Sequence, residues 1–581
     1  MVRFFQPIGN VLSIFPMTFP CYGIMSVSFH REARQVTIRV RYKTFDPLPS
    51  ADELIYAKLP AHPFWSYVEN TIDFSFADTL CAVLYTGRGQ HPYAPSLKLK
   101  IHLIQSYYDL SDRQVEEKII SDLFIKRFLH VPVNFFGFDH STIGRDRSRM
   151  GEVMFHACHL YILAQMYSHG LWGDKNEQWI MDSFPTNIHM VRRGAYRLIQ
   201  HAMVRLVQHL RSQAPPSVRT AAQSLPLDAM EVRLRSAMSS ADLMLAFSKL
   251  VAQAYGLLQW FDHDTIQPLL AEWTSYARSQ ELQAILRRIL EENSRPTDPD
   301  KGTKADRTAD LPFEKTPRGE RPKDRIESAV DPEARTAMKR SKVILGYKTQ
   351  NLCTTDGVIL EVRAVPANEH DQDATADMTS TIQQVFRQTP VALLGDTAYG
   401  HGRHRVRLAK QGIHVVAPVQ PSSNPTGLFP ATLFTYDADR DGFICPNGER
   451  SVRKNHTAQL EGSQYRFDKN TCLACPLYTQ CTTSKSGRSV FRSDYVHLYE
   501  AAQAYNESLA GQADLLQRYV VERKNNELKN NCGLGLAKTR SRTSLQLKAF
   551  CAAMVVNLKH TVRNLLHPKP GFLRHARPAL E

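Results

Sequence analysis

The sequence predicts a protein of mixed α/β class, with a helical N-terminal region followed by a core built on a mixed sheet. Three observations support this fold class. Helical patterns dominate the chain up to about residue 293, strand-like runs gather after residue 325, and helix returns from about residue 496. A chain of 581 residues is also too long for one simple core, so we expect several domains.

The N-terminal region carries the clearest helix signals. Ser111 and Gln114 form a capping-box pair, and apolar residues follow them at helical spacing. Ser141 is a second candidate N-cap, opening a short basic helix that carries Arg145 and Arg147. Short capped helices with arginines are typical of helices that contact DNA. An ordinary helical bundle with a solvated basic face fits the same pattern.

The middle of the chain alternates between regular and irregular patterns. A strand-like run lies at 178–185, and a long helical region follows from about 194 to 293. Pro, Gly and charged residues then indicate a flexible linker, and a hairpin signal follows around Asp356-Gly357. We expect these units: an N-terminal extension, 1–60; a helical DNA-binding domain, 61–170; a strand plus helical insertion, 171–293; a linker, 294–325; core, 326–435; a Cys-rich insertion, 436–495; C-terminal helices, 496–566; and a basic tail, 567–581.

Composition favours a soluble protein with a polyanionic partner. Lys and Arg number 72 against 57 Asp and Glu, giving a net charge of +15, and the pI is near 9.3. This surplus favours nucleic acid, although a merely basic soluble protein has the same balance. The sequence contains no run of 18 apolar residues, so it predicts no membrane-spanning helix. The uneven placement of the cysteines indicates a metal site in a reducing cytoplasm, in preference to a disulfide framework.

Three acidic residues stand at informative places. Asp396 ends the apolar run "VALLGD", where it could simply cap the next turn, and Asp182 follows a similar run in "WIMD". Glu522 lies in a strongly helical stretch, with Arg518 one turn before it and Lys529 about two turns after it. The sequence therefore predicts a carboxylate flanked by two cations on one helix face.

Such carboxylates suit phosphodiester chemistry. Cutting or transferring a phosphodiester is commonly done with two hard cations about 4 Å apart, which Mg²⁺ or Mn²⁺ can supply. These ions take oxygen ligands, and water and substrate phosphates fill the positions that protein carboxylates leave. Aspartates at strand ends and a glutamate on a helix can converge in a mixed sheet, although they are far apart in sequence.

Several motifs, in order, resemble those of bacterial insertion-sequence transposases of the DDE type. "DSFPTN" is similar to the motif of the first catalytic aspartate, "LLGDTAYG" to the second, and "RYVVERKNNELK" to the R-x₃-E-x₆-K signature of the glutamate. "GYKTQ" and "DGVILEVRAVPANEHD" resemble the second and third core strands, and the helical N-terminal region is similar as well. The resemblance spans most of residues 60 to 566 and implies a ribonuclease H-like core.

The resemblance also implies an activity and its residues. Asp182, Asp396 and Glu522 would be the catalytic residues that hold two Mg²⁺ ions, while Arg518 and Lys529 would contact phosphate. Water would cut the element's end, and the freed 3′-hydroxyl would attack the target. The partners would be double-stranded DNA, both element ends and target, and a second copy of the chain in a dimer or higher oligomer.

One departure from the family pattern concerns an aromatic residue. Related elements often have Tyr three residues before the signature Arg, and this chain has Leu515 there. Tyr399 or Tyr519 could supply the missing DNA contact. Two rival functions remain open: a transposase-derived DNA-binding regulator, and a metal-dependent nuclease that cuts without joining.

Four cysteines cluster in the loop-rich region 436–495. Cys472 and Cys475 have the spacing of a zinc knuckle, and Cys445 and Cys481 could complete a tetrahedral Cys₄ site for a structural Zn²⁺. His456 is an alternative ligand, and four free thiols are the simpler alternative. Zinc is favoured because a loop-rich segment with little core of its own gains folding energy from a metal.

Overall fold

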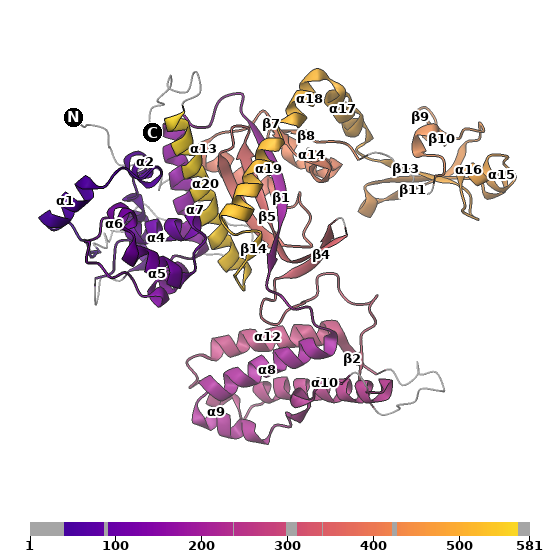
Figure 1. Ribbon diagram of the computed structural model, residues 1–581. Helices are drawn as coiled ribbons and strands as arrows, with labels where there is room; N and C mark the ends of the chain where they lie inside the picture. The colour runs from indigo at the N-terminus through magenta and orange to yellow at the C-terminus, as the bar shows by residue number, and fades with distance from the viewer. Residues whose placement is uncertain are drawn as a thin grey trace, which may run out of the picture.

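The computed structural model has a central sheet with three units attached to it (Figure 1). An N-terminal helical unit lies on one side of the sheet, a second helical unit lies below it, and a small β-rich unit projects on the opposite side. This arrangement confirms the mixed α/β class and the helical N-terminal region. The structure describes residues 40–85, 91–235, 238–297, 311–339, 341–420 and 427–567.

The central sheet is mixed. Strand β1 is paired on one side with the antiparallel strand β5 and on the other side with the parallel strand β7, which is followed by the parallel strand β8. The strand order β6-β5-β1-β7-β8 is consistent with a ribonuclease H-like core. A short strand, β4, extends the pairing of β5, and β14 pairs with the far end of β1. The strands are β1 (Gln178–Ile188), β4 (Arg335–Lys339), β5 (Lys342–Thr354), β6 (Ile359–Pro366), β7 (Ala392–Leu394), β8 (His414–Val416) and β14 (Leu536–Ala537).

A long C-terminal helix, α20 (Arg542–Leu566), covers the outer edge of the sheet, where it packs on β6. Gln546 accepts a hydrogen bond from the Ala364 N–H at 2.7 Å, and Asn557 exchanges two bonds of 2.8 Å with the Ile359 backbone. These side chains satisfy backbone groups that an edge strand would otherwise leave unpaired. The edge of β6 is therefore closed by the protein itself.

The N-terminal helical unit shares one hydrophobic core with the sheet. Its longest helix, α7, packs against α20, and His159 of α7 bonds the Leu360 carbonyl of β6 at 2.9 Å. The capping box of Ser111 and Gln114 is present. The helices of this unit are α1 (Ser50–Lys58), α2 (Trp65–Thr71), α3 (Phe76–Leu80), α4 (Pro95–Tyr107), α5 (Asp112–Ser121), α6 (Leu123–Leu129) and α7 (His140–Ser168).

One prediction for this unit was wrong, and it concerns the N-cap of α7. The N-cap of α7 is Asp139, whose carboxylate accepts the Ser141 N–H, so Ser141 lies inside the helix. The short basic helix that carries Arg145 and Arg147 is confirmed, because Gly151 has non-helical backbone angles and separates residues 140–150 from the rest of α7. Helix α1, within the expected extension, contacts this unit, because the Tyr56 hydroxyl donates to the Val131 carbonyl at 2.7 Å. Residues 1–39 of the expected extension lie outside the described residues.

The second helical unit follows β1 and has a separate hydrophobic core. By length and composition alone, α10 could cross a membrane; in this structure its buried residues pack within that core. The expected linker is partly regular, because β2 (Ser294–Pro296) pairs antiparallel with β3 (Phe313–Lys315). The stretch 298–310 lies outside the described residues. The helices are α8 (Ala195–Gln213), α9 (Pro216–Ala221), α10 (Ser240–Asp262), α11 (Gln267–Leu270) and α12 (Tyr276–Asn293).

The β-rich unit holds the four clustered cysteines. A three-stranded sheet, β11-β12-β13, and a two-stranded ribbon pack around a small aromatic core. Antiparallel pairing carries the chain out from the central sheet and back (Figure 1). Its elements are β9 (Thr435–Asp437), β10 (Gly442–Ile444), β11 (Ser451–Thr457), β12 (Gly462–Phe467), α15 (Lys469–Leu473), α16 (Tyr478–Cys481) and β13 (Ser489–Ser493).

Candidate active site

The register of two parallel strands brings Asp182 and Asp396 together. Ile180 of β1 is paired with Leu394 of β7, and each aspartate lies two residues beyond its paired residue. Neighbouring strands lie about 4.8 Å apart, so the two carboxylates occupy adjacent positions at the carboxyl end of β7. The apolar run that ends at each aspartate is the buried strand that positions it.

Electrostatics confirms that the two carboxylates are neighbours. The pKa of Asp182 is raised from 3.8 to about 6, mainly because burial disfavours the charged form, and the negative charge of Asp396 raises it further. The Ser183 N–H and the cations Lys339 and Arg518 oppose this rise. A divalent cation bound beside the two carboxylates would lower this pKa, because it would favour the charged form.

Asp396 has a second, structural role. One of its oxygens accepts the Ala398 N–H at 2.9 Å and caps a single 3₁₀ turn. This is the capping role that the sequence allowed as the simpler alternative for Asp396. Gly395 allows the turn to close, because a Cβ there would lie only 2.7 Å from Tyr399. Capping occupies one oxygen of Asp396 and leaves the other for a ligand.

A buried arginine fixes the loop behind Asp396. Arg405 in α14 (Gly402–Ala409) donates to the carbonyls of Gly400, Val415 and Ala417 at 2.9, 2.6 and 2.9 Å. Its guanidinium therefore ties the turn to β8. Sequence reasoning missed this residue, since a lone Arg in a basic helix gives no sign that it is buried.

Helix α19 (Tyr519–Asn526) crosses the sheet beside β1 (Figure 1). Asn525 donates to Asp182 at 2.9 Å and accepts from Asn351 of β5 at 3.0 Å. Glu522 is exposed and precedes Asn525 by three residues, so both lie on one helix face. The amide of Asn525 is thus the direct contact between this helix and the aspartates, and sequence reasoning missed it.

The helix changes its geometry after Asn526. Residues Glu527–Asn531 form a π turn, which widens the helix, so positions deduced from an uninterrupted α-helix do not hold for Lys529. Lys529 is half-buried and Arg518 lies at the N-cap of α19. Arg518 is close enough to Asp182 to lower its pKa, which puts this cation beside the aspartates.

The donor set suits a hard divalent cation, though only in part. Asp182 and Asp396 supply oxygen atoms and two adjacent negative charges that a cation would neutralise. Among the described residues, no group of three or more His, Cys, Asp or Glu side chains is close enough to hold a metal ion. The structure therefore brings the two aspartates together and leaves Glu522 outside such a group.

The other side chains expected to contact DNA differ in their exposure and in their ion pairing. Tyr399 is 0% exposed, so its proposed DNA contact is wrong for this structure; Tyr519 is 62% exposed. Arg147 is paired with Asp112 at 2.5 Å, and this internal partner offsets its charge. Arg145 is exposed, and its side chain bonds only Ser141 in the part of the chain described here.

The four clustered cysteines surround one cavity of about 80 Å³ in the β-rich unit. Burial raises the pKa of the Cys481 thiol, and the other three cysteines are close enough to raise it further. None of the nine cysteines in the described residues forms a disulfide. The thiols share one space but, as placed, do not form a metal-binding group.

Comparison with protein families agrees with this geometry. A family model described as "Transposase domain (DUF772)" matches residues 53–149, and one described as "Transposase DDE domain" matches residues 311–558. The second match includes Asp396 and Glu522 but begins after Asp182, whose place rests on its position in the sheet. No curated protein and no solved structure matches the chain.

The mixed sheet, its adjacent strand-end aspartates and the second family match together define an enzyme of phosphoryl transfer. The two matches together span more than half of the chain. The chain belongs to the DDE transposases, enzymes that bind DNA and use a divalent metal ion.

Proposed function

We propose that this chain is the transposase of an insertion-sequence element and catalyses both cutting and joining of DNA. In the first step water attacks the phosphorus at the element's end, and the 3′-oxygen leaves as a free hydroxyl. In the second step that hydroxyl attacks a phosphodiester of the target, and the target's own 3′-oxygen leaves. The observation that carries the proposal is the pairing of β1 with β7, which sets Asp182 beside Asp396.

The proposed ligands are Asp182, Asp396 and Glu522, which would hold Mg²⁺ or Mn²⁺. Bound there, the ions would activate the attacking oxygen and neutralise charge on the phosphate. Asn525 holds the Asp182 carboxylate in place through the bond of 2.9 Å. Glu522 is exposed and lies one turn before Asn525 on α19, and this place beside the residue that contacts Asp182 supports it as the third ligand.

The cations at the two ends of α19 are the proposed phosphate contacts. Arg518 lies close to Asp182, and Lys529 follows on the π turn. Tyr519 is exposed, with the Arg523 guanidinium 5.7 Å from its ring centre, and it is the aromatic residue available for a DNA contact. We also propose that two element ends are held by a dimer or higher oligomer, because both must be joined to one target.

A structural Zn²⁺ in the β-rich unit is part of the proposal. The shared cavity and the closeness of Cys445, Cys472, Cys475 and Cys481 support it, since small rotations of the side chains would direct four sulfurs to one point. Metal analysis of protein purified without chelators should find one zinc per chain. Loss of that zinc in a Cys472→Ser/Cys475→Ser variant would identify the site, and zinc-free wild-type protein would refute it.

The function is tested with a plasmid that carries the DNA flanking this gene on both sides. With Mg²⁺ the purified chain should cut at the element's ends and join them to a second plasmid. Asp396→Asn should abolish both steps. The matched control is Asp377→Asn, which changes a half-buried aspartate of α13 (Thr375–Phe386) that pairs with Arg407 at 2.8 Å. Cutting without joined product would favour the nuclease alternative, and binding without cutting would favour the regulator.

A further inference from the structure

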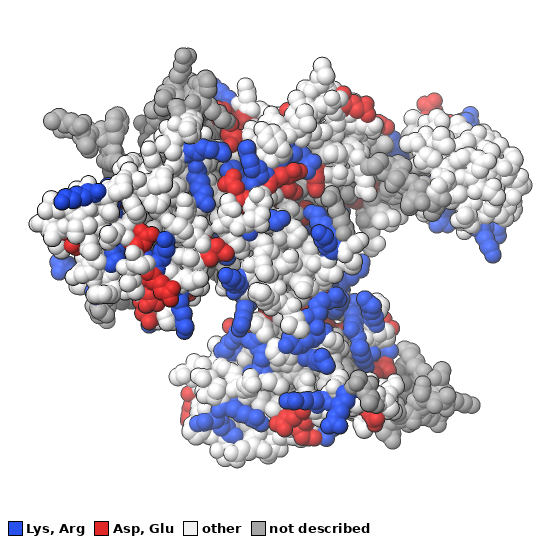
Figure 2. Space-filling model, in the orientation of Figure 1, with Lys and Arg blue, Asp and Glu red and all other residues white. Residues whose placement is uncertain are grey.

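A basic cavity lies where the second helical unit joins the core. It measures about 430 Å³ and is lined by the segment between β1 and α8 and by the loop that follows β3. Glu327 is the one acidic residue that lines it among the described residues. Figure 2 shows Lys and Arg gathered over this junction and over the adjoining helices. The six cations of the cavity are Arg192, Arg193, Lys315, Arg318, Arg321 and Arg325.

Most of these charges are not neutralised. In the described parts of the chain, only Arg325 of the six forms an ion pair, with Glu327 at 3.2 Å. Arg321 donates twice to the Thr316 carbonyl, at 3.0 and 2.9 Å, which orients it without offsetting its charge. Burial lowers the pKa of Arg321, and Arg325 and Arg318 lower it further. The cavity is therefore a concentration of positive charge that lacks its counter-charge.

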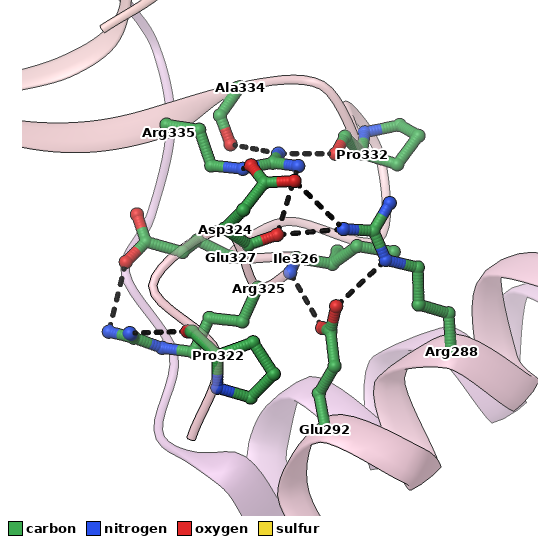
Figure 3. Close-up of polar contacts among 10 residues, drawn as sticks. All are labelled: Arg288, Glu292, Pro322, Asp324, Arg325, Ile326, Glu327, Pro332, Ala334 and Arg335. Atoms are coloured by element: carbon green, nitrogen blue, oxygen red, sulfur yellow. Dashed lines mark hydrogen bonds and ion pairs between the residues drawn. The ribbon is translucent and has the colours of Figure 1, made fainter. Parts of the chain in front are cut away.

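The loop that carries three of the cations is held rigidly (Figure 3). Glu292 of α12 accepts the Ile326 N–H at 2.7 Å and an Arg288 bond at 2.7 Å. The buried Arg335 donates a hydrogen bond to the Asp324 carboxylate at 2.8 Å, and Arg288 donates to the Asp324 backbone carbonyl at 2.7 Å. The nearby carboxylates Glu292 and Asp324 thus anchor the loop, and Arg318 and Arg321 of the same loop form no ion pair in the described chain.

Helix α8 adds to the same positive field. It has 19 residues, its N-cap is Gly194, and no side chain caps it. Gly194 and Ala195 line the cavity, so the N-terminal end of the helix dipole faces the space between the cations. Backbone N–H groups at such an end bind anions, and here they add to charges already present.

A basic stripe continues from the cavity along α8. Arg197, His201 and Arg205 follow one another at four-residue spacing, so they lie on one face of the helix, and Arg193 directly precedes its N-cap, Gly194. Burial lowers the pKa of His201, and the positive charges of Arg193 and Arg205 lower it further. Arg540, which belongs to the core, is close enough to Arg205 to lower the pKa of that group. The stripe therefore reaches from the cavity back to the core.

We propose that this cavity and the stripe on α8 bind the backbone phosphates of DNA that also passes the aspartates. The inference rests on the proposed function, because it assumes that the DNA is the substrate. Six residues of β1 separate Asp182 from the end of the strand, a span of about 20 Å or roughly six base pairs. A duplex cut at the aspartates is long enough to reach the cavity, which would fix its direction.

The test measures DNA affinity in EDTA, so that it does not depend on cutting. The variant is Arg192→Ala/Arg318→Ala, because both side chains are exposed cavity residues with no internal ion pair in the described chain. The control is Arg211→Ala/Arg219→Ala, which removes two exposed arginines of the same unit outside the cavity. The probes are a duplex from the gene's flank and a duplex of unrelated sequence.

Loss of two phosphate contacts should weaken binding about 5- to 30-fold at 0.15 M salt and lower the salt slope by about 2. The control should bind like wild type. If the variant loses affinity for the flank duplex alone, the cavity binds the element's end. If it also loses affinity for the unrelated duplex, the cavity binds target DNA or DNA in general. Wild-type affinity and slope for both duplexes would overturn the inference, whereas failure of wild-type protein to cut would overturn the proposed function and leave this result standing.

Discussion

Replacing Asp182 with Asn should stabilise the protein in the absence of metal. Its carboxyl has a pKa of about 6 in the folded chain, against 3.8 ordinarily, so keeping it ionised at pH 7 costs at most about 3 kcal/mol. An amide of the same shape removes this cost, and it can still accept the bond from Asn525. In EDTA at pH 7, Asp182→Asn should raise the Tm by several degrees.

The effect should depend on pH and on metal. Because the pKa of Asp182 is raised in the folded chain, the free energy of unfolding of the wild type falls as pH rises from about 4 to 6. The stabilities of variant and wild type should therefore converge near pH 4. Saturating Mg²⁺ should stabilise the wild type and leave the variant unchanged, because a ligand that binds only the folded state shifts the melt. Thermal melts monitored by circular dichroism measure both effects. A variant that is less stable than wild type in EDTA at pH 7 would refute the reasoning.

Four further substitutions separate the roles of residues around the aspartates. Asn525→Ala removes a donor to the Asp182 carboxylate, so the acidic limb of the cleavage pH profile should move to higher pH; an unmoved limb contradicts this role. Arg405→Met leaves three backbone carbonyls without a donor and should cost roughly 3 kcal/mol of stability by denaturant melts, and an unchanged midpoint would exclude it. Glu522→Gln should lose cleavage and keep DNA affinity, while Lys529→Ala should flatten the salt slope by about 1; a Gln variant that still cuts disproves the assignment.

Local patterns were enough to predict the strands and their aspartates. The apolar run before Asp396 reads as a buried strand, and the run before Asp182 reads the same way, because both are short, apolar and end in a turn or polar residue. The capping box at Ser111 was predicted for the same reason, since its two partners are three residues apart. Each of these features depends on neighbouring residues alone.

Long-range packing decided what the sequence did not predict. Asn525 meets Asp182 across 343 positions of the chain, and no local pattern indicates that contact. Tyr399 was expected at the surface, yet the absent side chain of Gly395 lets its ring fold into the core. The supposed linker is partly a β-ribbon of β2 and β3, and its Asp324 accepts bonds from Arg288 of α12 and Arg335 of β4; composition alone does not reveal these contacts.

The most direct test of the central claim is metal binding by the aspartates themselves. Titration of Mn²⁺ into metal-free protein, followed by electron paramagnetic resonance, should show binding to wild type at pH 7.5 and a fall in affinity below about pH 6, as Asp182 takes up its proton. Asp182→Asn and Asp396→Asn should each abolish that binding. Tight Mn²⁺ binding that survives both substitutions would contradict the account, because the ion would then belong to some other site.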